Sequence, residues 1–493
     1  MTFRNKIIAA IATAVITIAA TSCSGKPEVL EFVPSTATTV VSVDLERFLT
    51  EAGCTFNDEG ITLSDDLREA LDSAENSSTK AQINALLHIK GLDLKTATYF
   101  EQKDIEGGLI VIVADDEDKV VESLSDKVLN LEKGEDDGFV TFTNLPERTA
   151  TIAIDDNRCW LAGLNPDGAI SLIKKARRAA KKESIASIGW KADVLSKKAA
   201  LNAIVDVGDK FYDIFGDEAY RTAFAGITSG EGDSVLDIKA HIVNADGDKL
   251  DILPSLGTID PDFLHFFSSH HNTVIAFAIA DDFNWDNMLK SEGKSMASAD
   301  KIFLSTMEEH LRNIDGTVAV GLNIDLDNLS PEKLDFCVAA KMKQGGADGV
   351  INKIREMAAD VKQTLTERDG FLFLPMEERT LRIGKADNYL VLTTDAGVSA
   401  EPCTINADTF KGKSAVIAAS GIHVNPTLDF VISATTDEAS LDLSIDKTRQ
   451  GALAKLIKII IKESKNQSDA LQSLLKRGDD DFSEDNYDNL IEF

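Results

Sequence analysis

The residues best suited to chemistry lie in one short histidine-rich segment. Three histidines closely follow two aspartates there: His265, His270, His271, Asp260 and Asp262. Imidazole nitrogens and carboxylate oxygens are ligands that bind zinc, but the spacing differs from the HExxH pattern that places two histidines on one helical face. The segment also precedes a strand-like run of residues. We therefore predict a polar loop here and no metal site.

Patterns typical of enzymes are incomplete in this sequence. The G-x-S-x-G pattern of a nucleophile elbow does not occur. Two Gly-Lys-Ser sequences, 293–295 and 412–414, match the end of a phosphate-binding loop but lack its first glycine. Paired carboxylates, which a hydrolase of envelope polymers would use, are too numerous to single out one pair. The sequence predicts no catalytic residue and no cofactor. A hydrolase stays open as an alternative because catalytic groups converge in space rather than in sequence.

One group of basic residues contrasts with the acidic character of the chain. Six cations fall within residues 174–182, and the apolar residues of 169–180 recur at helical spacing, so they would form a separate buried stripe. The cations could receive an anionic partner: lipopolysaccharide, an acidic glycan or the chain's own acidic tail. Alternatively, they form a solvated helix face, favoured by the helix dipole near its C-terminus. The six candidates are Lys174, Lys175, Arg177, Arg178, Lys181 and Lys182.

Composition and charge limit the classes of protein that are compatible with this sequence. The chain has 493 residues, 43% apolar and 27% charged, which is ordinary for a globular protein of two to four folding units. Acidic side chains outnumber basic ones 82 to 51, giving a formal net charge of −31. That field repels phosphate backbones, so no nucleic-acid partner is expected.

The N-terminal residues predict export and lipid attachment. Arg4 and Lys6 precede an apolar run over residues 7–20, which is shorter than the roughly 20 residues of a spanning helix. The small residues directly before Cys23 resemble the lipobox of bacterial lipoproteins, whose peptidase cleaves before the lipid-bearing cysteine. The resemblance implies a signal peptide over residues 1–22 and a lipid at Cys23. An ordinary signal peptide with a fortuitous cysteine is the alternative.

The same resemblance implies a location for the mature chain. A lipid at Cys23 would anchor it to the outer membrane of a bacterial cell envelope. Residues 24–27 lack the acidic run of the surface-export signal of Bacteroides-type lipoproteins, which favours the periplasmic face. The expected partners are the membrane, through the lipid, and an unidentified envelope protein or glycan.

Internal similarity predicts a duplicated body. Residues 138–161 and 370–392 share a strand–turn–strand pattern; their arginines Arg148 and Arg379 lie 231 positions apart, as do Asn157 and Asn388. Amphipathic stretches, 118–131 and 348–365, precede the two blocks, and 39–43 matches 273–277. We therefore predict repeat domains over 23–255 and 256–465, followed by an acidic, disordered tail over 466–493.

Alternating apolar and polar residues predict the fold class. Period-2 runs joined by Asp-Asn and Asp-Gly turns indicate hairpins, and helical patterns separate them. The sequence therefore predicts an α+β protein of two similar tandem halves, each a mainly antiparallel sheet packed with helices.

Four cysteines remain after the lipobox: Cys54, Cys159, Cys337 and Cys403. They allow three disulfide pairings, which the sequence cannot rank. Cys159 and Cys337 lie in apolar, strand-like runs, so we predict that these two are buried free thiols.

The opening of the mature chain, residues 32–45, carries a family resemblance. Its proline, small residues and hydrophobic strand resemble Bacteroides-type envelope lipoproteins classed as a domain of unknown function. The resemblance implies an exported, two-part α+β lipoprotein and supplies no established activity. The sequence favours a lipid-anchored, non-catalytic binding or scaffolding protein. The alternatives are the envelope hydrolase and a carrier of an apolar ligand held between sheet and helices.

Overall fold

A computed structural model describes most of the chain between residues 28 and 445. The sequence predictions for the signal peptide (1–22), for Cys23 and for the acidic tail (466–493) lie outside the described residues. The described ranges are 28–51, 53–57, 60–72, 87–102, 107–145, 148–215, 217–229, 236–253, 256–281, 283, 310, 312–324, 335–360, 364–375, 380–394, 401–423 and 427–445.

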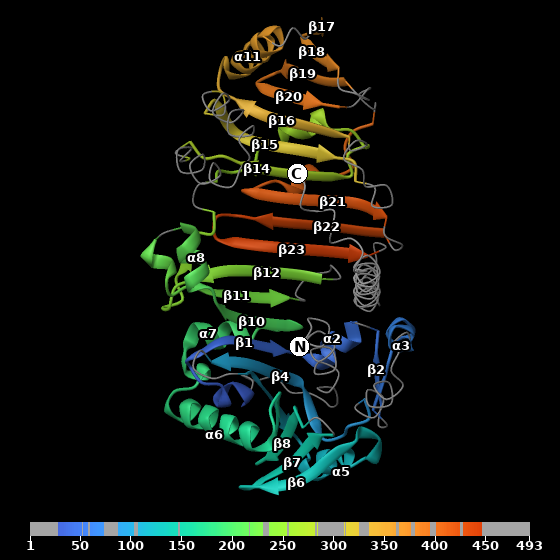
Figure 1. Ribbon diagram of the computed structural model, residues 1–493, viewed down its shortest axis with the longest axis vertical. Helices are drawn as coiled ribbons and strands as arrows, with labels where there is room; N and C mark the ends of the chain where they lie inside the picture. The colour runs from blue at the N-terminus through green and yellow to red at the C-terminus, as the bar shows by residue number, and fades with distance from the viewer. Residues whose placement is uncertain are drawn as a thin grey trace, which may run out of the picture. The chain divides into compact units, whose positions relative to one another are not determined.

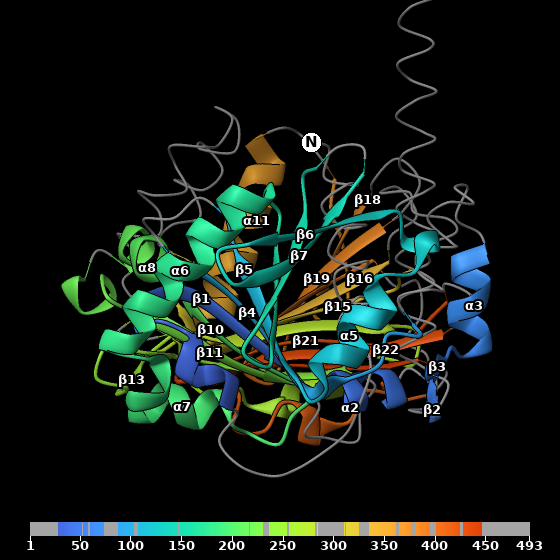
Figure 2. The ribbon, with the colours of Figure 1, turned by 90° about the horizontal axis from the view of Figure 1, so that it is seen from below.

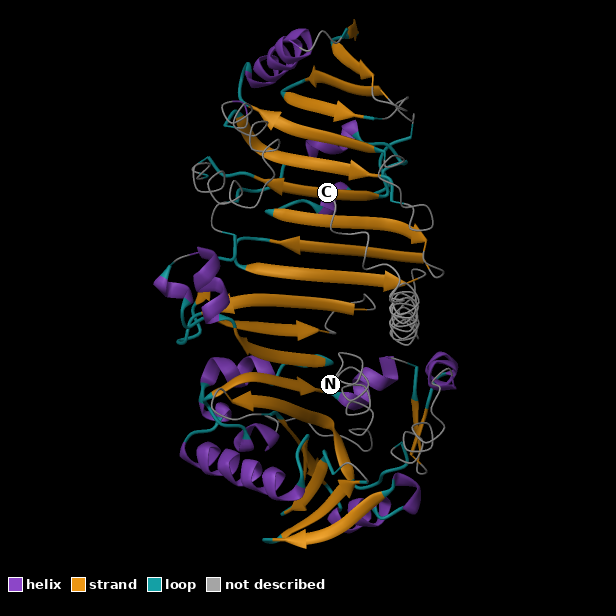
Figure 3. Cartoon of the chain, in the orientation of Figure 1, coloured by secondary structure: helices purple, strands orange, loops and turns teal. Residues whose placement is uncertain are grey.

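The fold is of the α+β class, and its sheet strands are mainly antiparallel (Figure 3). This confirms the predicted class. None of the helices in the described ranges combines the length and hydropathy needed to cross a membrane. The chain divides into two compact units, and it passes from the first to the second between Asn202 and Ala203. The predicted boundary between residues 255 and 256 lies inside the second unit.

The first unit contains a seven-stranded antiparallel sheet in the order β1-β4-β5-β9-β8-β7-β6. The strands are β1 (Ala37–Val43), β4 (Leu92–Gln102), β5 (Leu109–Ala114), β6 (Leu131–Asp136), β7 (Phe139–Asn144), β8 (Thr151–Asp155) and β9 (Arg158–Ala162). A small hairpin, β2 (Thr55–Asn57) and β3 (Gly60–Thr62), lies apart from that sheet.

Helices pack around the sheet of the first unit (Figures 1 and 2). They are η1 (Glu28–Phe32), α2 (Leu45–Glu51), α3 (Asp65–Asp72), α5 (Glu117–Leu124), η2 (Lys127–Leu129), α6 (Pro166–Lys182), η3 (Ile185–Ser187) and α7 (Gly189–Leu195). The core gathers buried residues of β5, α5, β7 and β9, including Ile112, Leu124, Phe142 and Cys159. Strand β10 (Leu201–Asp206) crosses the junction of the two units.

The second unit contains an antiparallel sheet in the order β11-β12-β23-β22-β21-β14-β15-β16-β20-β19-β18-β17 (Figure 1). The strands are β11 (Phe224–Ser229), β12 (Leu236–Val243), β14 (Thr273–Ala278), β15 (Ile314–Leu322), β16 (Phe336–Met342), β17 (Thr366–Arg368), β18 (Phe371–Pro375), β19 (Thr380–Ala386), β20 (Tyr389–Thr393), β21 (Ala415–His423), β22 (Thr427–Ala434) and β23 (Glu438–Ile445). A short strand, β13 (Lys249–Leu250), pairs with β12.

Among the described residues of the second unit, the helices are η4 (Glu218–Tyr220), η5 (Pro261–Phe266), η8 (Ala407–Thr409), α8 (Gly208–Phe215) and α11 (Gly346–Asp360). One core lies beneath η5 and includes Phe263, Phe410, Val274 and Val416. A second core joins α11 to β16 and β18–β20.

Tight turns with left-handed backbone conformations join the hairpins. Asp137 and Gly138 have φ values of 51° and 86°, and Asp369 and Gly370 have φ values of 51° and 80°. Asp and Gly accept positive φ at low cost, which fits the primed turns of two-residue hairpins. The predicted turn at Asn157 is confirmed, with a φ of 60°.

The amphipathic stretch predicted over 118–131 is only partly helical. Helix α5 ends at Leu124, and the carboxylate of Asp126 accepts the backbone N–H of Val128 at 2.9 Å to begin η2. Asn130 then adopts a left-handed φ of 53°, which turns the chain into β6. The second stretch, predicted over 348–365, forms α11 and ends earlier, at Asp360.

The four described cysteines are free thiols, and Cys159 and Cys337 are buried as predicted. Burial raises the pKa of the Cys159 thiol to about 12, so the thiol is protonated at neutral pH.

Candidate functional site

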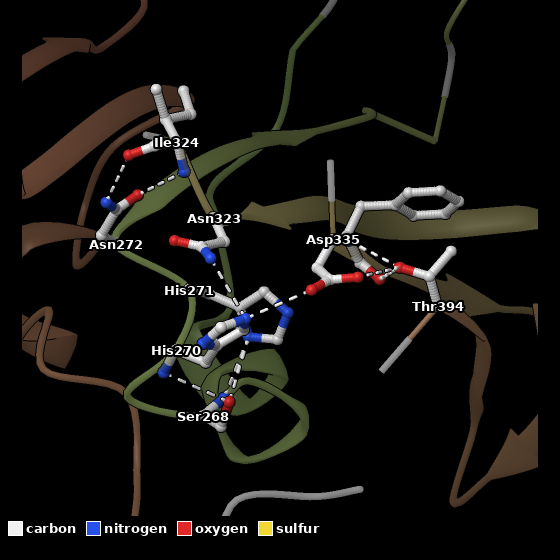
Figure 4. Close-up of polar contacts among 9 residues, drawn as sticks. Ser268, His270, His271, Asn272, Asn323, Ile324, Asp335 and Thr394 are labelled. Carbon is white, nitrogen blue, oxygen red and sulfur yellow. Dashed lines mark hydrogen bonds and ion pairs between the residues drawn. The ribbon is translucent and has the colours of Figure 1, made fainter. Parts of the chain in front are cut away.

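The predicted histidine segment comprises η5 and the turn that joins it to β14. His270 and His271 lie in that turn, beside the end of β15 and the start of β16 (Figure 4). His270 Nε2 lies 3.3 Å from Asp335 Oδ2 and 3.1 Å from Asn323 Nδ2. His270 Nε2 can accept a hydrogen bond from the Asn323 amide only when it carries no proton. It can donate a hydrogen bond to the Asp335 carboxylate only when it carries a proton. The two contacts are therefore alternatives. The His270 side chain is 45% exposed, as expected of a polar surface loop.

His271 is 1% exposed and has a structural role (Figure 4). Its Nδ1 accepts the backbone N–H of Ser268 at 3.1 Å, which places the proton of the neutral ring on Nε2. The Ser268 hydroxyl lies 3.5 Å from the same Nδ1, a long contact for a nucleophile and its base. Asp335 contacts His270 rather than His271. The serine, histidine and aspartate therefore do not form one catalytic relay.

The third histidine and the two aspartates lie apart from these contacts. His265 Nε2 lies 3.6 Å from Asp387 Oδ2. Asp260 caps η5 by accepting the backbone N–H of Asp262 at 3.2 Å, and it binds Lys341 Nζ at 2.7 Å. The hydrogen bond from Lys341 holds the pKa of Asp260 below its ordinary value. Within the described ranges, no group of three or more His, Cys, Asp or Glu side chains is placed to bind a metal ion.

The six predicted cations all lie on α6, and its buried side consists of Ala169, Ile170, Leu172, Ile173, Ala176 and Ala180. Asn165 begins the helix by accepting the backbone N–H of Gly168 at 2.9 Å. Two cations are held by nearby acids: Lys174 forms an ion pair with Asp137, and Arg177 forms one with Asp155. The exposed cations are Lys175, Arg178, Lys181 and Lys182.

A broad apolar surface, which the sequence analysis did not identify, lies on one face of the sheet in the second unit. Its central row consists of five residues in register across five adjacent strands, which we call the apolar ladder: Ile275, Ile417, Ile432, Leu441 and Ile238. Ile417 is 36% exposed and Ile432 is 43% exposed. The opposite face of β14 and β21 is core, because Val274 and Val416 are buried there.

The rows on either side of the apolar ladder are also uncharged. One row consists of Phe277, Ala415, Ala434, Ala439 and Ala240. In the other row Thr273 and Ala419 are buried, and Phe430 and Leu443 are partly exposed. Phe277 is 36% exposed. The sequence signal was the presence of apolar residues at consecutive positions of 274–278 and 415–419. In a strand that is buried on one side only, apolar and polar residues should alternate. Consecutive apolar residues therefore indicate a strand with two apolar faces.

Comparison with known proteins assigns no family. No family model matches the chain, and no curated protein matches it. A solved structure titled "Structure of crystal form I of TP0453" has a TM-score of 0.25 and 8% identity, and covers 46% of this chain and 82% of that chain. Crystal form III of TP0453 has a TM-score of 0.20 and 7% identity, and covers 74% of this chain and 92% of that chain. At these TM-scores the likeness carries no argument.

Proposed function

We propose that this protein is a lipid-anchored, non-catalytic binding protein of the bacterial cell envelope, and that the apolar ladder is its binding surface. The exposure of Ile417, Ile432 and Phe277 on one uncharged face carries the proposal. Soluble proteins rarely expose a contiguous apolar patch unless it serves an interaction. The polar side chains of the histidine segment, in contrast, cap a helix, hold a loop or pair with neighbouring side chains.

The dimensions of the face favour one amphipathic helix of a partner protein as its occupant. Five strands about 4.8 Å apart, with two exposed rows about 6.7 Å apart, give a patch of roughly 19 by 7 Å between Cα positions. A helix about 10 Å wide presents three to four turns to a patch of that size. An obligate homodimer usually buries about 2,000 Å² or more in total, more than two such patches supply.

We also propose that the two tandem halves arose by duplication. The strand order β1-β4-β5-β9-β8-β7-β6 of the first unit recurs as β14-β15-β16-β20-β19-β18-β17 in the second. An α-helix follows the third strand of each series in the chain, α5 in one and α11 in the other. Matching order through seven strands supports a common origin.

The strand register supports the same proposal. In the first unit, residues paired across the adjacent strands β1, β4, β5 and β9 form one row: Val43, Ala97, Ile112 and Cys159. The corresponding row runs through Phe277, Val318, Ala340 and Leu390. Val43 and Phe277 end the two similar strand sequences, and Cys159 and Leu390 occupy equivalent places in the two similar hairpin sequences. The strand match and the hairpin match were found separately in the sequence, and in each unit the same strand register connects them.

Photocrosslinking in the native cell tests the binding surface. A benzoylphenylalanine at position 432 should crosslink to one envelope protein, through a peptide with apolar residues at helical spacing. The matched control is position 442, on the opposite face of the neighbouring strand β23. Ile417→Asp should reduce the crosslink at least fivefold. Equal crosslinking at both positions, or crosslinking that Ile417→Asp leaves unchanged, would contradict the proposed surface.

Cell fractionation tests the lipid anchor separately. Cys23→Ala, combined with replacement of residues 1–22 by a signal peptide that an ordinary signal peptidase removes, should move the protein from the membrane fraction to the soluble fraction. Mass spectrometry of the unaltered mature chain should find an acylated cysteine at its first position. An unacylated N-terminus, or a Cys23→Ala variant that stays in the membrane, would exclude this anchor.

A further inference from the structure

The exposed side of α6 near its C-terminus concentrates positive charge. The apolar side of α6 is buried against the first unit, so the opposite side of the helix faces solvent. Lys174 and Arg177 point toward Asp137 and Asp155, acids of the adjacent hairpins. The remaining basic side chains are therefore turned away from those acids.

Three of these side chains form a compact group, which we call the outer cations: Arg178, Lys181 and Lys182. Their spacing of three and four residues places them on one face, within about 6 Å along the helix axis. The negative end of the helix dipole stabilises their positive charges. The group presents a cluster of positive charge on a chain whose net charge is −31.

We propose that the acidic segment 478–493 of this same chain binds the outer cations. That segment carries seven carboxylates and no basic side chain: Asp479, Asp480, Asp481, Glu484, Asp485, Asp488 and Glu492. The first three are consecutive, so an extended chain places their charges within about 7 Å, which matches the extent of the cation group. The two surfaces are complementary in sign and in length.

Covalent connection favours this segment over an external polyanion. A tethered ligand has an effective concentration that reaches the millimolar range. About 30 residues lie between the end of β23 at Ile445 and Gly478, and a chain of that length spans up to about 100 Å. A free polyanion must instead approach against the net negative charge of the whole protein.

Exposed ion pairs are screened by salt, so the contact should be reversible and sensitive to ionic strength. This contact is independent of the function proposed for the apolar ladder.

Zero-length carbodiimide crosslinking of the full chain in detergent provides the first test. At 20 mM NaCl, Lys181 and Lys182 should form isopeptide bonds to acids of the segment 478–493, at least fivefold more often than Lys197 and Lys198. Those two control lysines are exposed on the same unit. The difference should disappear at 500 mM NaCl. Equal crosslinking of both lysine pairs at low salt would overturn the proposal.

Binding to phosphatidylglycerol vesicles provides the second test and separates the segment from an external anion; every chain in this test is a soluble one without the lipid at Cys23, so that the lipid does not hold it on the vesicle. Changing the seven acids of the segment to their amides should strengthen vesicle binding about tenfold at 20 mM NaCl. Adding Arg178→Ser, Lys181→Ser and Lys182→Ser should return binding to that of the unaltered chain. If the amide variant binds vesicles no more tightly than the unaltered chain, the segment does not cover the outer cations and the proposal fails.

Discussion

At the scale of single residues, Asp155 connects three parts of the first unit. Its carboxylate accepts the indole N–H of Trp160 at 3.0 Å and forms an ion pair with Arg177 of α6. The Asp155 side chain is 10% exposed, whereas Arg177 is 34% exposed. Loss of the carboxylate would leave a buried indole N–H without its acceptor, while water would still solvate part of the guanidinium.

Asp155→Ala should therefore lower the free energy of unfolding by about 2–4 kcal/mol, within the range for breaking a partly buried ion pair and its hydrogen bond. Urea denaturation followed by tryptophan fluorescence measures the change. Glu132→Ala is the control in the same unit, because it removes an exposed ion pair with Arg148 and should cost no more than about 0.5 kcal/mol. Similar midpoints for the two variants would contradict the structural role of Asp155.

Asp260 predicts a dependence of stability on pH. Lys341 holds the pKa of Asp260 below its ordinary value, so the ionised carboxylate stabilises the folded state above about pH 4. That contribution is lost as pH falls through the lowered pKa, because the unfolded chain binds the proton more tightly. Asp260→Asn keeps a capping side chain and removes the charge.

Urea midpoints of Asp260→Asn should lie below those of the parent protein at pH 6–7, and the two should converge below about pH 4. Asp262→Asn, an exposed change two residues away, should follow the parent at each pH. A gap between Asp260→Asn and the parent that persists unchanged to pH 2.5 would show that the charge of Asp260 is not the cause.

At the scale of elements, β21 presents adjacent side chains to different surroundings. Val416 is 1% exposed and packs in the core beneath η5, whereas Ile417 is 36% exposed on the apolar ladder. Val416→Ala should cost about 1–3 kcal/mol of unfolding free energy, because it leaves a cavity. Ile417→Ala removes more carbon atoms but should cost about 1 kcal/mol or less.

Urea denaturation of the two variants checks this order. If Ile417→Ala were the more destabilising change, the ladder would be a core surface rather than a binding surface. The two positions are neighbours on one strand. A difference in stability between the two variants therefore cannot come from a difference in β propensity between strands.

Element types were more predictable from the sequence than their ends and contacts. The apolar strand residues of 151–155 and the Asp-Asn turn that follows them identify the β8–β9 hairpin, because these signals are local. The end of α5 depends on the Asp126 side chain and on the left-handed conformation of Asn130. The spacing of apolar residues contains no information on either, so it could not predict where the helix ends. The separation of His265 from His270 depends on Asp387 and Asp335, partners more than sixty positions away.

The candidate surfaces differ in predictability for the same reason. The cations of α6 are close together in sequence, so their clustering was evident, but the neutralisation of Lys174 by Asp137 was not. The apolar ladder draws one residue from each of five strands, and only the register brings them together. The sequence could therefore mark the apolar strands without identifying the surface that they form.

At the scale of the whole molecule, the net charge of −31 predicts how salt affects stability. The Debye length falls from about 30 Å at 0.01 M salt to about 8 Å at 0.15 M, which screens repulsion between distant carboxylates. The urea midpoint should therefore rise when NaCl increases from 10 to 150 mM. Replacing the added NaCl with sucrose of equal osmolality should not reproduce a rise that comes from screening. A midpoint that falls with salt would show that attractive ion pairs outweigh the repulsion.

The pairing of β12 with β23 has a consequence for how the chain acquires its structure. Strand β12 ends at Val243, but its neighbour β23 begins only at Glu438. The pairing therefore closes a loop of roughly 200 residues, and closing so long a loop is a slow step of folding. Until it closes, the backbone groups of residues 236–241 that bond to β23 have no neighbouring strand and can pair with a wrong one. The folding chain therefore passes through a period in which a holding chaperone would raise the yield of native protein.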